Sequence, residues 1–378
     1  MLKRKISSII LVIGLVAIAV TISVFILVRN GDRFPIPDAE PSFTGDPRSL
    51  KATIIAPTLD ASIDGQTNVI WCASFLAAWK ALEADLAKEP PSLRGAPKVA
   101  LDLNMASDPR PHISQECLYT AAGWNHEGIT EKITKDLARM FPTKPPPNFP
   151  GIAQNSFVAY AYLEANVKFS LPYFQNQKPL MFTDYAGVKT KLSSFGIRQE
   201  DDYAYFKLRR QPQILFKTWD KNYMRTDYII DLDRTSTPNQ IILAMVTPKP
   251  TLLEMLSTIK EKIDTTKERQ GNNDIGPNDV LLVPDMVWNI THRFVELEGQ
   301  EFANPKLIGQ RIDVAQQDIQ FRLDRSGAEL KSEAKMYMCP TPTYYIVDRP
   351  FLIVMKKRGA DTPYFVMWVA NAELLRKW

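Results

Sequence analysis

Apolar residues form one unbroken run near the start of the chain and later follow helix-like or strand-like spacing. Residues 6–28 carry no charge, and about 20 apolar residues are what a helix needs to cross a membrane. The basic residues Lys3, Arg4 and Lys5 precede this run, and such clusters tend to stay in the cytoplasm. We therefore expect a single-pass membrane protein with a cytoplasmic tip at residues 1–5, a transmembrane signal-anchor helix, and everything after the helix outside the cytoplasm.

A cleaved signal peptide is the alternative interpretation of the same run. Its apolar core would usually be about 7–15 residues long and would end in small residues. Here the run is longer and ends in Phe25, Ile26, Leu27 and Val28, followed by Arg29. The pattern favours an uncleaved anchor, with the rest of the chain on the periplasmic or extracellular side.

Prolines dominate the stretch after the apolar run. Residues 29–64 contain Pro35, Pro37, Pro41, Pro47 and Pro57. Prolines at this density predict a stiff, loop-like spacer between the bilayer and a globular domain at residues 65–378. The whole chain has 45% hydrophobic and 23% charged residues, which is ordinary for a protein with a large core.

The spacing of apolar residues inside the domain predicts both helices and strands. Three- and four-residue spacing predicts helices over residues 73–87, 129–140 and 251–263. Short apolar or alternating runs predict strands over residues 67–71, 157–163, 168–171, 203–208, 213–219, 228–232, 241–246, 279–284 and 319–323. Residues 344–356 and 364–370, joined by turn residues, predict a closing hairpin. Strands that gather late in the chain indicate an α+β fold.

Composition and charge exclude several classes of function. The formal net charge is +4, with basic and acidic residues interspersed, so no basic stripe for nucleic acid is expected. The three cysteines, Cys72, Cys117 and Cys339, are too few for a disulfide framework or a zinc site. We therefore expect neither a nucleic-acid partner nor a metal.

Catalytic motifs are also missing from the sequence. His112, His126 and His292 are the only histidines, and none lies in a motif typical of a metal site or an activated nucleophile. The pairs Asp231/Asp233 and Asp201/Asp202 could be imagined as acid and base, but carboxylates beside strands are usually solvated. We nominate no catalytic residue, expect no cofactor, and predict that the protein is not an enzyme.

One segment near the end carries a family resemblance. Residues 345–355 resemble the C-terminal signature of the serpins, the serine protease inhibitor superfamily, with Asp348, Arg349, Pro350 and Phe351 at its centre. Residues 323–329 resemble the serpin hinge. Weaker matches follow in serpin order at residues 68–71, 161–169 and 241–248.

The resemblance implies a divergent, membrane-anchored serpin-like protein with three β-sheets surrounded by helices. It also implies an exposed bait loop, the reactive-centre loop, between the hinge and the signature. A working inhibitor traps its protease by inserting this loop, once cut, into the main sheet. The energy comes from strain stored in the uncut form. The signature residues would have a structural role.

The hinge and the loop depart from the family pattern. The hinge residues are Gly327, Ala328, Glu329, Leu330, Lys331, Ser332, Glu333 and Ala334. The family has a run of small residues after the hinge glutamate, and the larger side chains here argue against fast insertion. The loop is also short, and its apex comprises Met338, Cys339, Pro340, Thr341 and Pro342. The expected scissile bond precedes a proline, and such bonds resist most serine proteases.

Residues 328–338 alternate between apolar or small residues and polar ones, which predicts a strand. We therefore hypothesise a hairpin whose second strand already lies in the main sheet of the uncut protein. This predicts a non-inhibitory binding or scaffold domain at the membrane. The alternative is a serine-type or cysteine-type endopeptidase inhibitor acting at the cell envelope. The partner would be a protease or another extracytoplasmic protein, and the sequence leaves the oligomeric state open.

Overall fold

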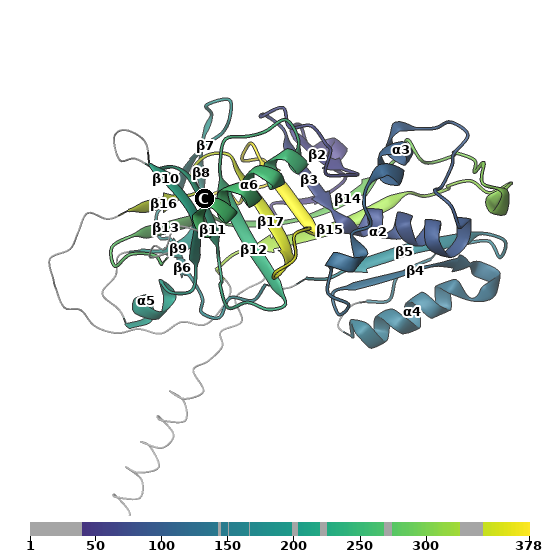
Figure 1. Cartoon of the computed structure of the whole chain (residues 1–378), viewed down its shortest axis with the longest axis horizontal. Coiled ribbons are helices and arrows are strands. Elements are labelled where there is room, and N and C mark those ends of the chain that lie inside the picture. The colour runs from purple at the N-terminus through teal and green to yellow at the C-terminus, as the bar shows by residue number, and fades with distance from the viewer. Residues whose placement is uncertain are drawn as a thin grey trace, which may run out of the picture. The chain divides into compact units, whose positions relative to one another are not determined.

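The computed structural model describes residues 40–142, 145–149, 151–165, 167–198, 203–219, 225–267, 274–325 and 343–378 (Figure 1). The predicted anchor, the hinge and the loop apex therefore lie outside the described residues. Within the described ranges, no helix combines the length and the apolar character that a membrane crossing requires. The chain from Glu40 onward is one compact unit.

The largest sheet has seven strands and forms the centre of the core. Its order is β10 (Gln213–Trp219), β11 (Arg225–Asp231), β12 (Asn239–Met245), β17 (Phe351–Lys357), β18 (Phe365–Val369), β3 (Asn68–Cys72) and β2 (Thr53–Ala56). Every residue of β12 and β18 is buried, so both faces of the sheet centre are covered. Such strands read as continuous apolar runs because neither face meets water.

Two further sheets flank the large one. A four-stranded sheet has the order β16 (Tyr344–Ile346), β13 (Val280–Pro284), β9 (Ser194–Ile197) and β6 (Phe174–Gln175). A three-stranded sheet has the order β1 (Phe43–Gly45), β14 (Met286–Arg293) and β15 (Gln316–Leu323). Phe321 of β15 stacks on Phe365 of β18, with ring centroids 4.8 Å apart, and so joins this sheet to the seven-stranded one.

Two strand pairs complete the β structure of the described residues. They are β4 (Leu118–Trp124) with β5 (Phe157–Leu163), and β7 (Leu180–Thr183) with β8 (Lys189–Leu192). Helix α4 (Ile129–Met140) packs on one face of the β4–β5 pair, and α2 (Ala73–Ala81) contacts both strands as well (Figure 1). Figure 1 shows the two helices on opposite sides of the pair.

The remaining helices are short or lie at the surface. They are α3 (Lys98–Met105), α5 (Tyr203–Leu208) and α6 (Leu252–Lys267), with one-turn 3-10 helices at Pro47–Ser49, Arg110–His112, Asn125–Glu127 and Pro305–Leu307. A turn of π-helix at Leu82–Ala87 continues α2. Helix α6 covers β10, where the Lys262 ammonium lies 4.6 Å from the Phe216 ring centroid.

The apolar spacing predicted most of these elements correctly. The helix predicted over 129–140 is α4, and the strands predicted over 157–163 and 213–219 are β5 and β10. The closing hairpin is confirmed as the antiparallel pair β17–β18, but residues 344–356 form two strands rather than one. The interruption between them, at residues 347–350, lies within the segment that resembles the serpin signature.

The strand predicted over 168–171 is wrong. The segment is irregular, because side chains satisfy its backbone donors in place of a neighbouring strand. The Ser170 amide donates to Asp233 Oδ2 at 2.7 Å, and the Leu171 amide donates to Gln211 Oε1 at 2.6 Å. Buried backbone amides need a partner, and here loops supply it.

The strand predicted over 203–208 is also wrong, since the segment is helix α5. Its alternating aromatic residues are typical of a strand, but charges favour the helix. Asp201 and Asp202 precede it in the sequence, and Lys207 lies in its last turn. Acidic residues before a helix and basic residues at its end both interact favourably with the helix dipole and stabilise the helix.

The segment predicted to be a loop-like spacer contributes strands from Glu40 onward. Strand β1 pairs in parallel with β14, and β2 pairs in parallel with β3. The prolines flank these short strands without interrupting them. Both strands cover sheet edges that would otherwise be free to aggregate.

Candidate functional site

The candidate loop joins two sheets, and the structure describes both of its ends. Residues Gly327–Ala334 of the hinge and Met338–Pro342 of the apex lie outside the described residues. The last residues described before them, Asp324 and Arg325, follow β15. Thr343, just before β16, is the first residue described after them. The site is therefore built from these two ends and from the strands that flank them.

Backbone and side-chain hydrogen bonds fix the end of β15 to a buried tyrosine. The Tyr173 amide donates to the Arg325 carbonyl at 3.2 Å, and Arg325 Nε donates to the Tyr173 carbonyl at 3.0 Å. Tyr173 is fully buried, and its hydroxyl donates to the Leu232 carbonyl. Arg322 forms an ion pair with Asp324. The chain therefore enters the loop from a fixed position.

The far end of the loop is held equally firmly. The Thr343 amide donates to Asp279 Oδ1 at 2.8 Å, and the Val280 amide donates to the Thr343 carbonyl at 2.8 Å. Strand β16 then pairs in parallel with β13, and the Tyr228 hydroxyl donates to the Ile346 carbonyl at 2.7 Å. The chain leaves the loop inside the four-stranded sheet.

Strands β5 and β15 each have one edge without a strand partner among the described residues. Strand β5 pairs with β4 alone, and β15 pairs with β14 alone. Helix α2 contacts both β5 and β15. Gln317 of β15 donates to the Cys72 carbonyl at 3.0 Å, next to the first turn of α2. We refer to the second edges of β5 and β15 together as the open edges.

The open edges fit a strand with one apolar face. Side chains of β15 alternate strictly between exposed and buried, with Gln317, Ile319, Phe321 and Leu323 buried. Strand β5 has the apolar sequence FVAYAYL, and each of its residues is only half-buried. Apolar strand edges of this kind readily accept a further strand.

The signature residues lie between β16 and the start of β17. The Asp348 carbonyl accepts the Thr183 amide at 2.8 Å, and Phe351 is fully buried against Phe182 with ring centroids 6.5 Å apart. Burial raises the pKa of the Asp348 carboxyl, while the charge of Arg349 acts in the opposite direction. The signature thus carries the chain from the four-stranded sheet into the centre of the seven-stranded one.

Asp231 and Asp233 are fully buried and hydrogen-bonded rather than solvated. Arg358 Nη1 lies 2.9 Å from Asp231 Oδ2, and Gln240 Nε2 donates to the same oxygen at 2.8 Å. Asp233 accepts hydrogen bonds from the Ser170 amide and from Thr235. The sequence did not predict this burial, and a network this complete has a structural role. The other pair, Asp201 and Asp202, lies outside the described residues.

Among the described residues, the cysteines and the potential metal ligands indicate neither a reactive thiol nor a metal site. Cys72 and Cys117 are free thiols, and burial raises the pKa of both. Buried thiols with a raised pKa are unreactive. No group of three histidine, cysteine or acidic side chains in the described ranges could hold a metal ion.

His292 is a partly buried histidine whose pKa is lowered by its surroundings. Its ring packs edge-on against Phe294 at 4.5 Å, and its Nδ1 is buried without a hydrogen-bond partner. Desolvation lowers the pKa of His292 below its usual value near 6.5, although the charges of Asp46 and Glu296 raise it. Arg48 adds to the lowering.

We expect acid to destabilise the protein through His292. Because its pKa is lower in the folded state, the unfolded state binds the proton first as the pH falls below about 6.5, and stability falls with it. His292→Leu should therefore reduce the decline in melting temperature between about pH 6.5 and pH 5. His112→Leu, at an exposed histidine, is the control. Equal pH profiles for the wild type and His292→Leu would contradict this account.

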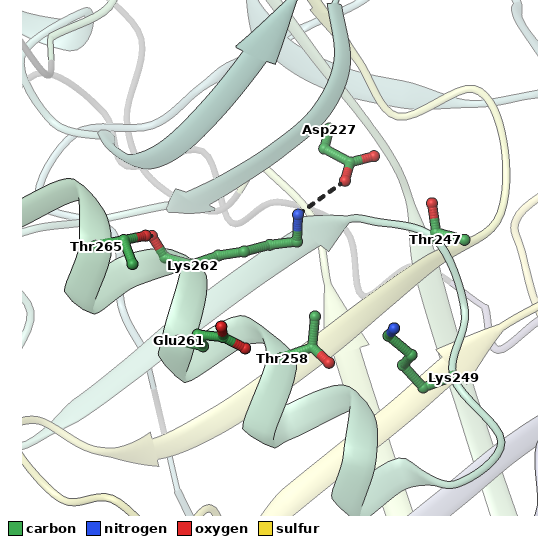
Figure 2. A pocket seen from close by; sticks show the side chains of 7 residues that line it. All are labelled: Asp227, Thr247, Lys249, Thr258, Glu261, Lys262 and Thr265. Carbon is green, nitrogen blue, oxygen red and sulfur yellow. Dashed lines mark hydrogen bonds and ion pairs between the residues drawn. The ribbon is translucent and has the colours of Figure 1, made fainter.

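A polar recess lies between α6 and the strands beside it (Figure 2). Its volume is about 460 Å3, and its lining residues are Asp227, Thr247, Lys249, Thr258, Glu261, Lys262 and Thr265. Lys262 Nζ lies 3.2 Å from Asp227 Oδ2. Four of the lining residues are exposed, so the recess is solvated and indicates no small-molecule ligand.

Comparison with known proteins gives likeness of fold alone. No protein-family model and no curated protein matches the sequence. Among solved structures, the chain is similar to native protease nexin-1 with heparin, at 10% identity and a TM-score of 0.45, over 80% of this chain and 92% of that one. The mouse protein-Z dependent protease inhibitor matches at 13% identity and a TM-score of 0.45, over 80% and 91%.

Human thyroxine-binding globulin in complex with thyroxine matches at 10% identity and a TM-score of 0.44, over 81% of this chain and 92% of that one. All three proteins are serpins. With TM-scores below 0.5, these likenesses assign neither an activity nor a partner to the chain.

Proposed function

We propose that this chain is a serpin-like, non-inhibitory binding or scaffold protein, tethered to the outer side of a membrane by residues 6–28. The observation that carries the proposal is that both ends of the loop are held in place. Its two ends are clamped at Arg325 and Thr343, and the residues between them are few and include large or charged hinge side chains. The serpin-like assignment rests on the signature, which occupies the junction between two sheets.

The hypothesis of a strand already inserted in the uncut protein falls on residues outside the described ranges and stays a prediction, but the clamped ends limit how far such a strand could pair. A strand of residues 328–338 running back along β15 would end about 33 Å from its start. Residues 339–342 span at most about 18 Å to Thr343. Strands β13 and β16 are at the left in Figure 1, while β14 and β15 extend to the right. Because β16, which follows Thr343, is paired to β13, we expect only the first part of the segment to reach the open edges.

The limited reach of residues 328–338 in the uncut chain also favours a second candidate function, a protease inhibitor. A cut in the apex would release residues 328–338, and they could then pair with the open edges. Inhibition also requires that insertion be faster than hydrolysis of the bond between protease and loop. Leu330, Lys331 and Glu333 oppose fast insertion, since a buried charge or a bulky side chain must pass between the strands. Pro342 opposes cleavage at the expected bond.

Incubation with serine proteases separates the two functions. We expect proteases to cut the loop between Tyr337 and Thr343 and to be released, so that gels in SDS show fragments and no protease-bound band. A variant with Leu330→Ala, Lys331→Ala and Glu333→Ala tests whether these three hinge side chains oppose fast insertion. A stable protease-bound band formed by the unaltered chain would refute the non-inhibitory proposal and establish the second candidate.

A further inference from the structure

The β7–β8 hairpin and the last residues of the chain form one continuous three-stranded surface. The amide of Trp378 donates to the Lys191 carbonyl at 3.1 Å, and Lys377 bridges to Leu192. This register places Trp378 opposite Lys191, which in turn lies opposite Met181. Because side chains alternate across a sheet, these three share one face.

The inner face of this surface belongs to the core, and the outer face is amphipathic. Leu180, Phe182 and Leu192 are buried on the inner side. The exposed apolar residues of the outer side and the hairpin tip are Met181, Tyr185, Val188 and Trp378, with 43%, 53%, 58% and 56% of their surface exposed. We call these four residues, with the exposed Lys178, Lys189, Lys191 and Arg376 around them, the hairpin patch.

The charge of the hairpin patch has one sign. Lys178, Lys189 and Lys191 form no ion pair with a carboxylate of the described residues. The nearest acidic side chain in the hairpin, Asp184, uses Oδ1 to accept the Val188 amide at 2.8 Å and so closes the turn. The hairpin patch therefore combines a tyrosine at the hairpin tip and a tryptophan with lysines that form no ion pair with a described carboxylate.

The chain from the predicted anchor enters the compact unit beside this surface. Ser42, the third residue described, donates from Oγ to the Leu374 carbonyl at 2.9 Å, four residues before Trp378. Only residues 29–39 separate the apolar run from Glu40, and their reach is at most about 40 Å. A short connection that ends beside an amphipathic patch would keep that patch within reach of the bilayer surface.

We infer that the hairpin patch rests on the headgroup layer of an anionic membrane. Tyrosine and tryptophan favour the membrane–water interface, where their rings are apolar and their polar atoms stay wet. Lysines beside them extend to lipid phosphates and are attracted by the negative surface potential. The membrane would thus hold the compact unit by two contacts, the predicted anchor and this patch. This inference adds to the proposed tethering and can fail separately from it.

The test uses the full chain in phosphatidylcholine vesicles with or without phosphatidylglycerol, and lipids brominated in their acyl chains as quenchers of tryptophan fluorescence. The share of the fluorescence that comes from Trp378 is the difference in emission between the wild type and Trp378→Phe. We expect bromolipid to quench most of this share when phosphatidylglycerol is present. Lys189→Glu with Lys191→Glu should remove the quenching, whereas Met105→Ser, at an exposed apolar residue of α3, should leave it unchanged.

Each outcome decides one of the two contacts. If the Trp378 share is the same with brominated and ordinary lipid, the patch does not touch the membrane and the inference is overturned. Extraction with alkaline carbonate tests the anchor separately. A chain that resists extraction without Trp378 quenching retains the anchor and loses the patch. A chain that is extracted by carbonate but shows quenching in vesicles retains the patch and loses the anchor.

Discussion

Cleavage of the loop apex is expected to raise the melting temperature of the protein by about 10 °C or more, because a gain of several kcal/mol shifts the transition of a chain of this size by that amount. In the intact chain, we expect the clamps at Arg325 and Thr343 to keep residues 328–338 from pairing along their whole length. A cut would remove this constraint. We expect the freed strand then to pair with an open edge and so to gain hydrogen bonds and bury apolar side chains.

The measurement is heat denaturation of the intact and the cut protein, with the cut located by mass spectrometry. Ala334 belongs to the apolar positions of the segment and Glu333 to the polar ones. Ala334→Arg should therefore abolish the gain, since insertion would bury an unpaired charge, and Glu333→Arg should preserve it. An unchanged melting temperature after the cut would show that the open edges do not accept the strand.

Arg358→Leu is expected to lower the free energy of unfolding by about 3–5 kcal/mol, because it leaves the fully buried Asp231 carboxylate without its cation. The same guanidinium donates to the Asp233 carbonyl at 2.7 Å and to the Ser236 carbonyl at 2.7 Å. Buried acceptors left without a donor add to the cost. Denaturation in guanidinium chloride measures the loss.

The double variant Arg358→Leu with Asp231→Asn tests whether the unpaired charge is the cause. The amide introduced by Asp231→Asn is neutral, so no unpaired charge remains buried. The double variant should therefore recover much of the stability that Arg358→Leu loses. If it is no more stable than Arg358→Leu, packing or the lost carbonyl partners explain the effect instead. Either way, a large loss from Arg358→Leu supports a structural role for the Asp231–Asp233 pair.

The elements that sequence predicted best are those whose burial follows a simple period. Helix α4 has one apolar stripe, and β10, β12 and β18 are continuous apolar runs in a sheet covered on both faces. The signature was found from its residue types alone. It lies between two sheets, with Phe351 fully buried, and the structural role expected for its residues stays a prediction.

Where sequence failed, contacts distant along the chain replaced the local preference. Residues 168–171 alternate like a strand, yet Asp233 and Gln211 from distant loops accept their backbone donors. The hairpin patch was missed for a related reason. Met181, Lys191 and Trp378 look unrelated in the sequence, and only the pairing of residues 191–193 with 376–378 brings them onto one face.

The sequence by itself determined the α+β class, most of the long helices and strands, the signature and the prediction of a membrane anchor, because each depends on residue type and local period. Only the tertiary structure decided where the two ends of the loop are held. Alternation in residues 328–338 indicates a strand, but whether that strand can insert depends on where its two ends are held. Those ends lie in different sheets, and this position, rather than the alternation, limits how far the segment could pair before it is cut.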